Sequence, residues 1–402
     1  MTRRAPAPGP LNRRTLLPAA LALGALFAVT AAPPAAADSV RDRQWGLTAL
    51  RAEEAWGTSR GDGVTVAVLD TGVDATHPDL VGQVLEGTDL VGMGATQGDK
   101  TWAKHGTAMA GIIAGHGHGS LGGVLGVAPR AKILPVRVIL EEGDPVRDQA
   151  RATKGGALAE GIRWAVDHGA DVINLSLGDD SSAAHHEATE DEAVQYALGK
   201  GVVVVASAGN GGNKGDRISY PAAYPGVIAV TAVNRENKKA SFSTRSWYAT
   251  VSAPGVNVII AQPDRSYPYG WGTSAAAAFV SGAVALVKAA HPDLSPAQIK
   301  NLLEDTASGS PPGGRDDSRG FGLVDPAAAL QAADGITPEP ALPLPVAATA
   351  RYFGSGPDPV PGPGIWARFA PPAGVAAGLA LLVAAVVLAR RPRAGRWDPQ
   401  GG

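Results

Sequence analysis

Runs of apolar residues alternate with amphipathic stretches along most of the chain. Four runs are almost continuously apolar, which is typical of strands buried on both faces of a parallel sheet. They span residues 64–69, 172–175, 202–206 and 227–233. A fifth run at 133–138 is interrupted by Pro135 and Arg137, and we expect it to be a strand as well. Stretches with helical spacing, 156–168 and 187–198, lie between strands, so the pattern predicts an α/β fold with a doubly wound, mostly parallel sheet flanked by helices.

Beyond residue 270 the pattern changes to helices. Residues 275–290 are rich in alanine and apolar throughout. A second helix is expected over 296–306, where Ser295 would be the N-cap and Gln298 would complete a capping box. We therefore expect one domain over residues 61–335, preceded by a short N-terminal extension at 38–60.

The N-terminus has the pattern of a secretory signal peptide, which we assign to residues 1–37. Arginines at positions 3, 4, 13 and 14 precede an apolar stretch at 16–32, and alanines at 35–37 form an A-x-A cleavage pattern. The paired arginines at 13 and 14 also fit a twin-arginine signal, and an uncleaved anchor helix is the other interpretation. Under each of these interpretations, the chain that follows residue 37 is exported from the cytoplasm.

The C-terminus predicts a single membrane anchor. A proline-rich linker at 336–372 precedes an apolar run at 373–389, which would span about 26 Å as a helix. A basic tail at 390–402 follows, and by the positive-inside rule it is cytoplasmic. A buried core helix is the alternative, but nothing foldable follows the run. We expect a single-pass protein of the cell membrane with an extracytoplasmic body.

Composition narrows the classes of function. The chain has 402 residues, 45% of them hydrophobic, which is enough for one large core. Its net charge of -2 gives no support for a nucleic-acid partner. Because there is no cysteine, disulfides, thiolate metal sites and cysteine nucleophiles are excluded.

Three polar residues could together perform nucleophilic acyl transfer, which needs a nucleophile, a base and a group that fixes the base. Asp70 follows the first apolar strand, at the edge of the sheet where ligands of open α/β folds bind. His105 stands in Lys-His-Gly-Thr, and Ser274 stands in Gly-Thr-Ser directly before the alanine-rich helix. Taken singly, Asp70 could be a turn residue and Ser274 an ordinary N-cap.

Asn210 is a fourth polar residue of interest. It follows the strand at 202–206 within Ser-Ala-Gly-Asn-Gly. Its side-chain amide could donate a hydrogen bond to a developing oxyanion, and the dipole of the helix after Ser274 would add to that effect. An Asn-Gly turn is the alternative interpretation.

In this order and with Asn210 between the second and third, Asp-Thr-Gly, His-Gly-Thr and Gly-Thr-Ser resemble the signatures of the subtilisin-like (subtilase) family. The resemblance covers residues 61 to about 330. It implies that Asp70 orients and stabilises His105, that His105 is the general base and then the general acid, and that Ser274 is the nucleophile. It also implies that Asn210 and the backbone N–H of Ser274 form the oxyanion hole.

The segment 174–178, Asn-Leu-Ser-Leu-Gly, resembles the part of the family that binds the substrate strand. By this resemblance Ser176, Leu177 and Gly178 would pair with the substrate backbone and line the first specificity pocket. The expected activity is that of a serine endopeptidase acting on proteins or peptides through an acyl-enzyme.

One subgroup is similar in its whole layout. The mycosins, subtilases associated with type VII secretion, share the order of signal, short extension, catalytic domain, proline-rich linker and one transmembrane helix. The extension and a charged insertion at 141–155 also resemble that subgroup. Residues 38–60 are too few to fold as a separate inhibitory domain, so we expect an enzyme that no large propeptide holds inactive.

No cofactor or metal ion is expected. Many subtilases bind calcium through oxygen ligands, but the acidic runs at 179–180, 190–192 and 316–317 lack a recognisable ligand spacing, and we interpret them as solvated surface. We likewise expect His116 and His118, in a glycine-rich loop, to be solvated.

Two other classes of function remain to be weighed. The domain could stabilise a membrane secretion complex, with proteolysis secondary, and type VII machinery would then be its partner. An ester or lipid hydrolase is disfavoured because no Gly-x-Ser-x-Gly elbow surrounds Ser274.

Overall fold

The computed structural model describes residues 39–119, 122–179, 181 and 184–341. The predicted signal peptide (1–37), the membrane helix (373–389), the basic tail (390–402) and most of the linker lie outside the described residues.

A seven-stranded sheet forms the centre of the body, and every pair of neighbouring strands in it is parallel. The strand order is β2-β5-β1-β6-β7-β8-β9. The strands are β1 (Thr65–Asp70), β2 (Thr88–Asp89), β5 (Lys132–Arg137), β6 (Val172–Leu175), β7 (Val203–Ser207), β8 (Ile228–Val233) and β9 (Val251–Pro254). The predicted parallel α/β sheet is confirmed, and the sequence pattern missed only its two edge strands.

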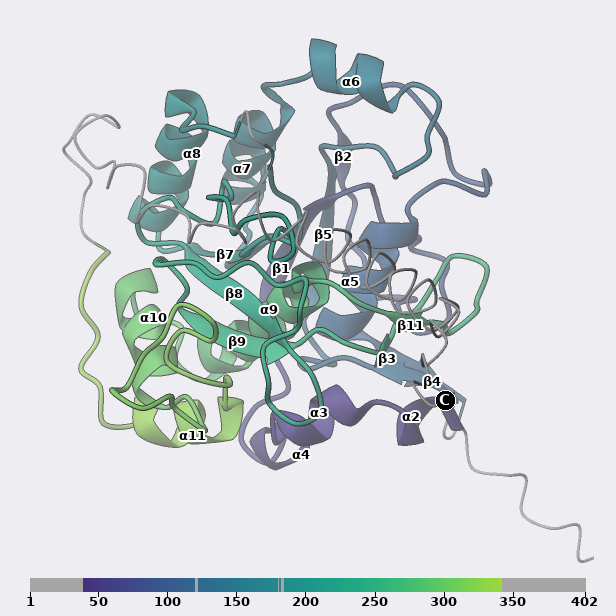
Figure 1. The fold of residues 1–402 in the computed structure, drawn as a ribbon. Helices are drawn as coiled ribbons and strands as arrows, with labels where there is room; N and C mark the ends of the chain where they lie inside the picture. Colours follow the sequence, from purple (N-terminus) through teal and green to yellow (C-terminus); the bar gives the residue numbers. More distant parts are fainter. Residues whose placement is uncertain (1–38, 120–121, 180, 182–183, 342–402) are drawn as a thin grey trace, which may run out of the picture.

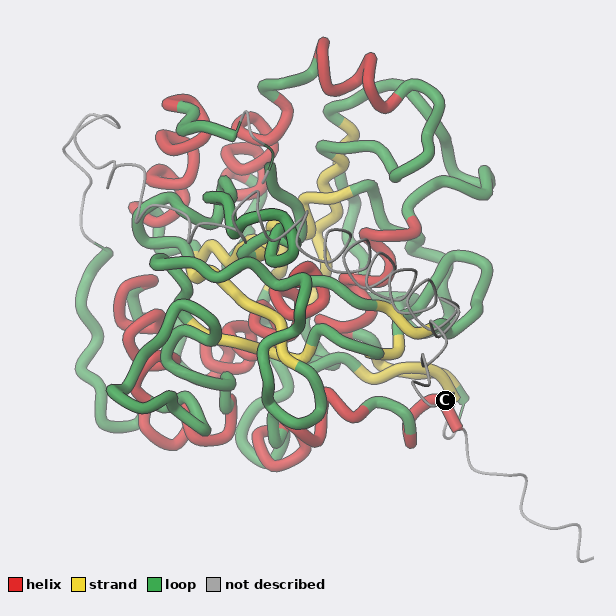
Figure 2. The backbone as a smooth tube through the Cα atoms, viewed as in Figure 1, coloured by secondary structure: helices red, strands yellow, loops and turns green. Residues whose placement is uncertain are grey.

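Helices cover both faces of the sheet (Figures 1 and 2). On one face, α5 (Lys104–Ala114) and α9 (Thr273–Ala290) pack on Val66 and Val68 of β1. On the other face, α7 (Ala157–Asp167) packs on β1 and β5, and α8 (Ala188–Gly199) packs on α7 and β7, around a core that includes Ala67 and Leu69. Successive side chains of a strand point to opposite faces, so a continuous apolar run is what a doubly covered strand requires.

The order of the strands changes direction at β1. From β1 the chain goes to β5 on one side, and it then crosses to β6 on the other side of β1. In open α/β sheets, ligands bind beyond the carboxyl ends of the strands at such a reversal of direction. Asp70 is the last residue of β1 and therefore lies at that point.

The remaining elements surround this core. Two antiparallel hairpins are formed by β3 (His116–His118) with β4 (Gly122–Leu125) and by β10 (Val258–Ile259) with β11 (Tyr269–Gly270). Short helices are α2 (Ser39–Asp42), α3 (Trp45–Ala49), α4 (Ala52–Ala55), α6 (Arg147–Thr153), α10 (Pro296–Asp305) and α11 (Pro326–Ala333). The predicted capping box of α10 is present, with Ser295 and Gln298 as its two members.

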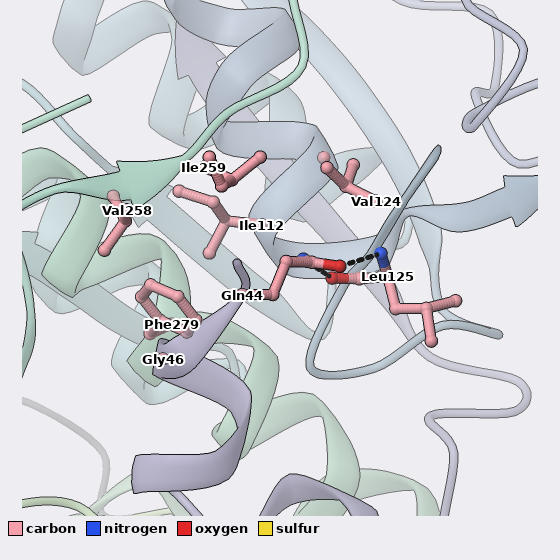
Figure 3. A pocket seen from close by; sticks show the side chains of 9 residues that line it. Gln44, Gly46, Ile112, Val124, Leu125, Val258, Ile259 and Phe279 are labelled. Carbon is pink, nitrogen blue, oxygen red and sulfur yellow. Dashed lines mark hydrogen bonds between the residues drawn. The ribbon is translucent and has the colours of Figure 1, made fainter. Parts of the chain in front are cut away.

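The N-terminal segment, residues 39–60, is part of the body. The side chain of Gln44 pairs with the backbone of Leu125, donating to its carbonyl at 2.7 Å and accepting from its N–H at 2.9 Å (Figure 3). Leu47 and Leu50 are buried in the main hydrophobic core. A Cβ added to Gly46 would lie 2.4 Å from a ring atom of Phe279 in α9, so the segment packs closely on the central helix.

Helix α9 is the one described helix that is long and apolar enough to cross a membrane. However, 83% of its apolar window is buried inside the body, where it contacts five strands of the sheet. It is therefore a core helix, and its alanines let it lie close to the strands.

Candidate active site

Asp70 is fully buried at the carboxyl end of β1, where a tight turn follows it. Gly72 in that turn has a φ of +100°, a conformation that favours glycine. Gly106, in the first turn of α5, meets the same turn closely, because a Cβ at this position would lie 2.0 Å from the carbonyl oxygen of Gly72. The two glycines thus bring the start of α5 against the carboxylate.

His105 is paired with Asp70. Its Nδ1 lies 2.8 Å from both carboxylate oxygens of Asp70. The imidazole is 36% exposed, so it faces the surface while Asp70 does not. Burial lowers the pKa of His105, but the charge and hydrogen bond of Asp70, together with the charge of Glu141, raise it above the ordinary value. This arrangement stabilises an imidazolium that forms when the ring accepts a proton.

Ser274 is the second residue of α9, and its position shows that the ordinary N-cap interpretation is wrong. The N-cap is Gly272, and no side chain caps the helix from that position. The Ser274 hydroxyl donates to the carbonyl of Ser176 at 3.0 Å, and the Ser176 hydroxyl donates to the carbonyl of Ser274 at 2.9 Å. These reciprocal bonds fix the first turn of α9 to the end of β6.

Asn174 stabilises this junction between α9 and the end of β6. Its side-chain Nδ2 donates to Ser176 Oγ at 2.9 Å, and its Oδ1 accepts from Ser281 Oγ at 3.0 Å. All three side chains are buried. Because buried polar groups in such a network allow few alternative arrangements, the backbone around Ser274 is held in one place.

Asn210 lies beside the start of α9. Its Oδ1 accepts from the backbone N–H and the hydroxyl of Thr273, both at 3.0 Å. A Cβ added to Gly272 would lie 3.7 Å from the N of Ser274 and 3.9 Å from Nδ2 of Asn210. Two nitrogen donors therefore border the same small space in front of Gly272, which is an arrangement suited to an oxyanion.

Ser176, Leu177 and Gly178 directly follow β6, and of the three Ser176 is bonded to Ser274. Gly178 is exposed and lies against Ser219, because a Cβ at Gly178 would be 2.7 Å from the Ser219 hydroxyl. A Cβ at Gly209 would meet the Ser219 side chain at 3.1 Å. Ser219 is fully buried, and its hydroxyl has no hydrogen-bond partner among the described residues.

The structure thus joins Asp70 to His105 by hydrogen bonds, and joins Ser274 to Ser176, with Asn210 beside the same helix start. Helices α5 and α9, which carry His105 and Ser274, pack against each other on one face of the sheet. Sequence reasoning missed Glu141 and Ser219. Neither stands in a motif, and each reaches the site only through contacts between segments distant in the sequence.

One expectation about polar surface residues was wrong. Asp191 is buried, since α8 turns it inward to accept a hydrogen bond from Gln195 at 2.9 Å. His118 is exposed as expected, but its Nδ1 is also hydrogen-bonded to the buried carboxylate of Asp79 at 2.6 Å. Among the described residues, no group of three or more His, Asp or Glu side chains is arranged to hold a metal ion.

Comparison with known proteins places this geometry in a family. The model of the subtilase family matches residues 61–322. Thermitase from Thermoactinomyces vulgaris is 38% identical over 265 residues, which cover 66% of this chain and 88% of thermitase. Fervidolysin from Fervidobacterium pennivorans is 38% identical over 320 residues, 73% of this chain, but the match spans only 44% of fervidolysin.

Solved structures agree with the sequence relatives. The structure of MycP1 from Mycobacterium smegmatis has a TM-score of 0.62 and 31% identity, covering 81% of this chain and 89% of that one. MycP1 has also been solved as a protein from the ESX-1 type VII secretion system. With the motifs, the sheet order and the Asp70–His105 pair in agreement, the chain belongs to the subtilase family of serine endopeptidases.

Proposed function

We propose that this chain is a membrane-anchored, extracytoplasmic serine endopeptidase that uses Asp70, His105 and Ser274 as its catalytic triad. The observation that carries the proposal is the Asp70–His105 pair, with Nδ1 at 2.8 Å from both oxygens, together with Ser274 in the first turn of α9. Such a pair fixes the tautomer and orientation of the imidazole, so Nε2 is available as a base.

In the proposed reaction, the Ser274 hydroxyl turns from the carbonyl of Ser176 to His105 and attacks the scissile carbonyl carbon. His105 takes the hydroxyl proton, and Asp70 stabilises the resulting imidazolium. The oxygen that gains negative charge is held by the Asn210 side chain and the Ser274 N–H, helped by the positive end of α9. His105 then gives its proton to the leaving amine, and a water molecule hydrolyses the acyl-enzyme by the same route.

Substrate would lie as an extended strand along Ser176, Leu177 and Gly178. Gly178 and Gly209 both lie close to the buried Ser219, so neither position could hold a side chain without displacing it.

The direct test compares wild type with Ser274→Ala and a control, Ser266→Ala, which changes an exposed serine in another loop. Wild type and the control should cleave an unstructured protein substrate and react covalently with a fluorophosphonate probe, whereas Ser274→Ala should do neither. A Ser274→Ala protein that still cleaves and labels would refute the assignment of the nucleophile.

The membrane anchor and the link to type VII secretion are further parts of the proposal. The anchor rests on the apolar run at 373–389 followed by arginines, and the secretion link rests on the similarity to MycP1. A chain that ends at residue 341 should be released in soluble form, while the full chain fractionates with membranes. Equal membrane association of both would refute the C-terminal anchor.

A role as a stabiliser of a secretion complex is the second function that the similarity to MycP1 favours. The two roles separate in one experiment, because Ser274→Ala removes the nucleophile while leaving the surface of the body unchanged. Co-purification of membrane secretion components that is unchanged by Ser274→Ala would support a structural role, and its loss would assign the effect to proteolysis.

A further inference from the structure

Glu141, the first residue of the insertion at 141–155, reaches the catalytic histidine from outside its helix. One carboxylate oxygen, Oε1, accepts the backbone N–H of His105 at 2.7 Å. The same oxygen accepts the hydroxyl of Thr71 at 2.6 Å. Thr71 directly follows Asp70 in the chain, so a single atom is bound to the backbone of one catalytic residue and to the neighbour of the other.

The Thr71 side chain completes a closed set of contacts. Its hydroxyl oxygen accepts the N–H of Gly106 at 3.1 Å, and its own N–H donates to Oδ1 of Asp70 at 2.7 Å. Through these bonds the carboxylates of Glu141 and Asp70 are linked by one threonine. The start of α5 and the turn after β1 cannot separate without breaking several hydrogen bonds at once.

Helix α5 needs this external contact because it has no cap of its own. Its N-cap position is Ala103, with a φ of 54°, and no side chain in that position accepts a hydrogen bond. The first N–H groups of a helix have no partner within the helix, and negative charge is stabilising there. The Glu141 carboxylate supplies both an acceptor and a charge at the turn that carries His105.

The insertion holds Glu141 in place. Asp144 accepts the N–H of Ala95 at 2.9 Å and that of Val146 at 3.0 Å, which ties the insertion to the loop after β2. Arg147 donates to the carbonyl of Leu140, next to Glu141. Val91, Leu140 and Ala150 form a small apolar cluster, and the partly buried Met93 and Val146 pack against it.

We propose that Glu141 is a positioning residue for the catalytic pair, which aligns His105 with Asp70 through Thr71 and adds a negative charge that favours the protonated imidazole. The charged groups that act on the His105 ring are Asp70 from β1 and Glu141 and Arg147 from the insertion. The first two favour the protonated ring and the third opposes it. This inference rests on the proposed triad.

Glu141→Gln is the sharpest test because it retains an acceptor oxygen and removes only the charge. Without that charge the pKa of His105 falls, so a smaller fraction of the ring is protonated at a given acid pH. The acid limb of kcat/KM against pH should therefore move to lower pH, and kcat on the plateau should fall severalfold because the imidazolium of the transition state loses support. KM should change little, since Glu141 does not line the proposed substrate strand.

Glu141→Ala removes the hydrogen bonds as well, and kcat should fall by on the order of tenfold or more. The control is Glu142→Gln, which removes the same charge from the exposed neighbouring residue. It should leave the acid limb in place. Thermal melting of each variant establishes that it is folded, and if Glu141→Ala does not fold, the isosteric Glu141→Gln still decides the question.

A readout independent of turnover is the NMR titration of ¹⁵N-labelled His105, assigned with His105→Gln. A Glu141→Gln protein whose His105 titrates as in wild type, or a Glu142→Gln protein that shifts equally, would overturn the inference. If wild type neither cleaves nor labels, the proposed function fails, while the titration of the ring still judges the role of Glu141.

Discussion

Two segments outside the sheet and its major helices differ in what they contact. The N-terminal segment at 39–60 is bonded to loops on the body, as in Gln44 with Leu125 and Trp56 with Val127. The insertion at 141–155 instead begins with a carboxylate on the backbone of His105. None of the described hydrogen bonds of the first segment reaches Asp70, His105 or Ser274.

The difference separates two kinds of attachment. The N-terminal segment buries apolar side chains in the main core, so it should contribute to the free energy of unfolding and leave the chemistry alone. The insertion packs into a small separate apolar cluster and accepts a hydrogen bond from the backbone of His105, so it should change the proposed chemistry more than the stability. The following variants test that separation.

The largest effect is expected for Leu50→Ala in the N-terminal segment. Leu50 is fully buried, and truncating such a side chain costs about 2–5 kcal/mol of unfolding free energy. Chemical denaturation should show this loss, while kcat/KM and its acid limb stay at the wild-type values under native conditions. A shift of the acid limb would mean that the segment does act on the site.

Asn210→Ala tests the site itself. Losing an oxyanion donor typically lowers kcat by about a hundredfold to a thousandfold, a magnitude known from subtilisin. Here the carbonyl oxygen of Asn210 also binds Thr273, so the melting temperature should fall as well. Steady-state kinetics with a peptide substrate and a melting curve check both parts. A kcat within a few fold of wild type would remove Asn210 from the oxyanion hole.

Trp56→Phe is a milder change to the N-terminal segment. The indole N–H donates to the carbonyl of Val127 at 2.7 Å, and losing this bond should cost about 1 kcal/mol of unfolding free energy. Phenylalanine keeps one aromatic ring but lacks the five-membered ring of the indole, so some loss of packing against the core adds to this cost. Denaturation midpoints measured beside those of Leu50→Ala should rank the two variants, with kinetics unchanged in both.

Asp144→Ala in the insertion should have the smallest effect. Unlike the variants of the N-terminal segment, it should change kcat rather than stability. It frees the N–H groups of Ala95 and Val146 and lets the insertion move with Glu141. We expect kcat to fall about two- to threefold, because small misplacements of catalytic groups are costly, with little change in melting temperature. A large loss of stability with unchanged kcat would place the insertion in the same class as the N-terminal segment.

Much of the fold could be predicted from sequence because the strands are buried on both faces. The runs ending at Asp70 and Leu175 are continuous in apolar residues, and helix α10 carries its own capping signals. The edge strands β2 and β9 could not be found this way, because a two-residue strand such as β2 has no period to detect. Helices α3 and α4 are similarly too short for a helical repeat.

The residues of the candidate site also differ in whether the sequence alone could identify them. Asp70, His105 and Ser274 stand in short motifs with glycines that the backbone requires, such as Gly106 beside the turn of Gly72. Glu141 has no motif, because its role depends on a loop folding back over the start of α5. Asp191 was misassigned because its burial depends on which face of α8 packs against the body, which a run of acidic residues does not indicate.

The ion pair between Arg51 and Asp325, at 2.7 Å, has a consequence for how the molecule is assembled. It joins a residue near the start of the body to the N-cap of its last helix, α11, across 274 positions of sequence. Contacts between such distant positions form late in folding, because closing the long loop between them costs conformational entropy before the contact can stabilise the fold. The packing around α4, near the start of the body, is therefore complete only after α11, near its end, has been synthesised.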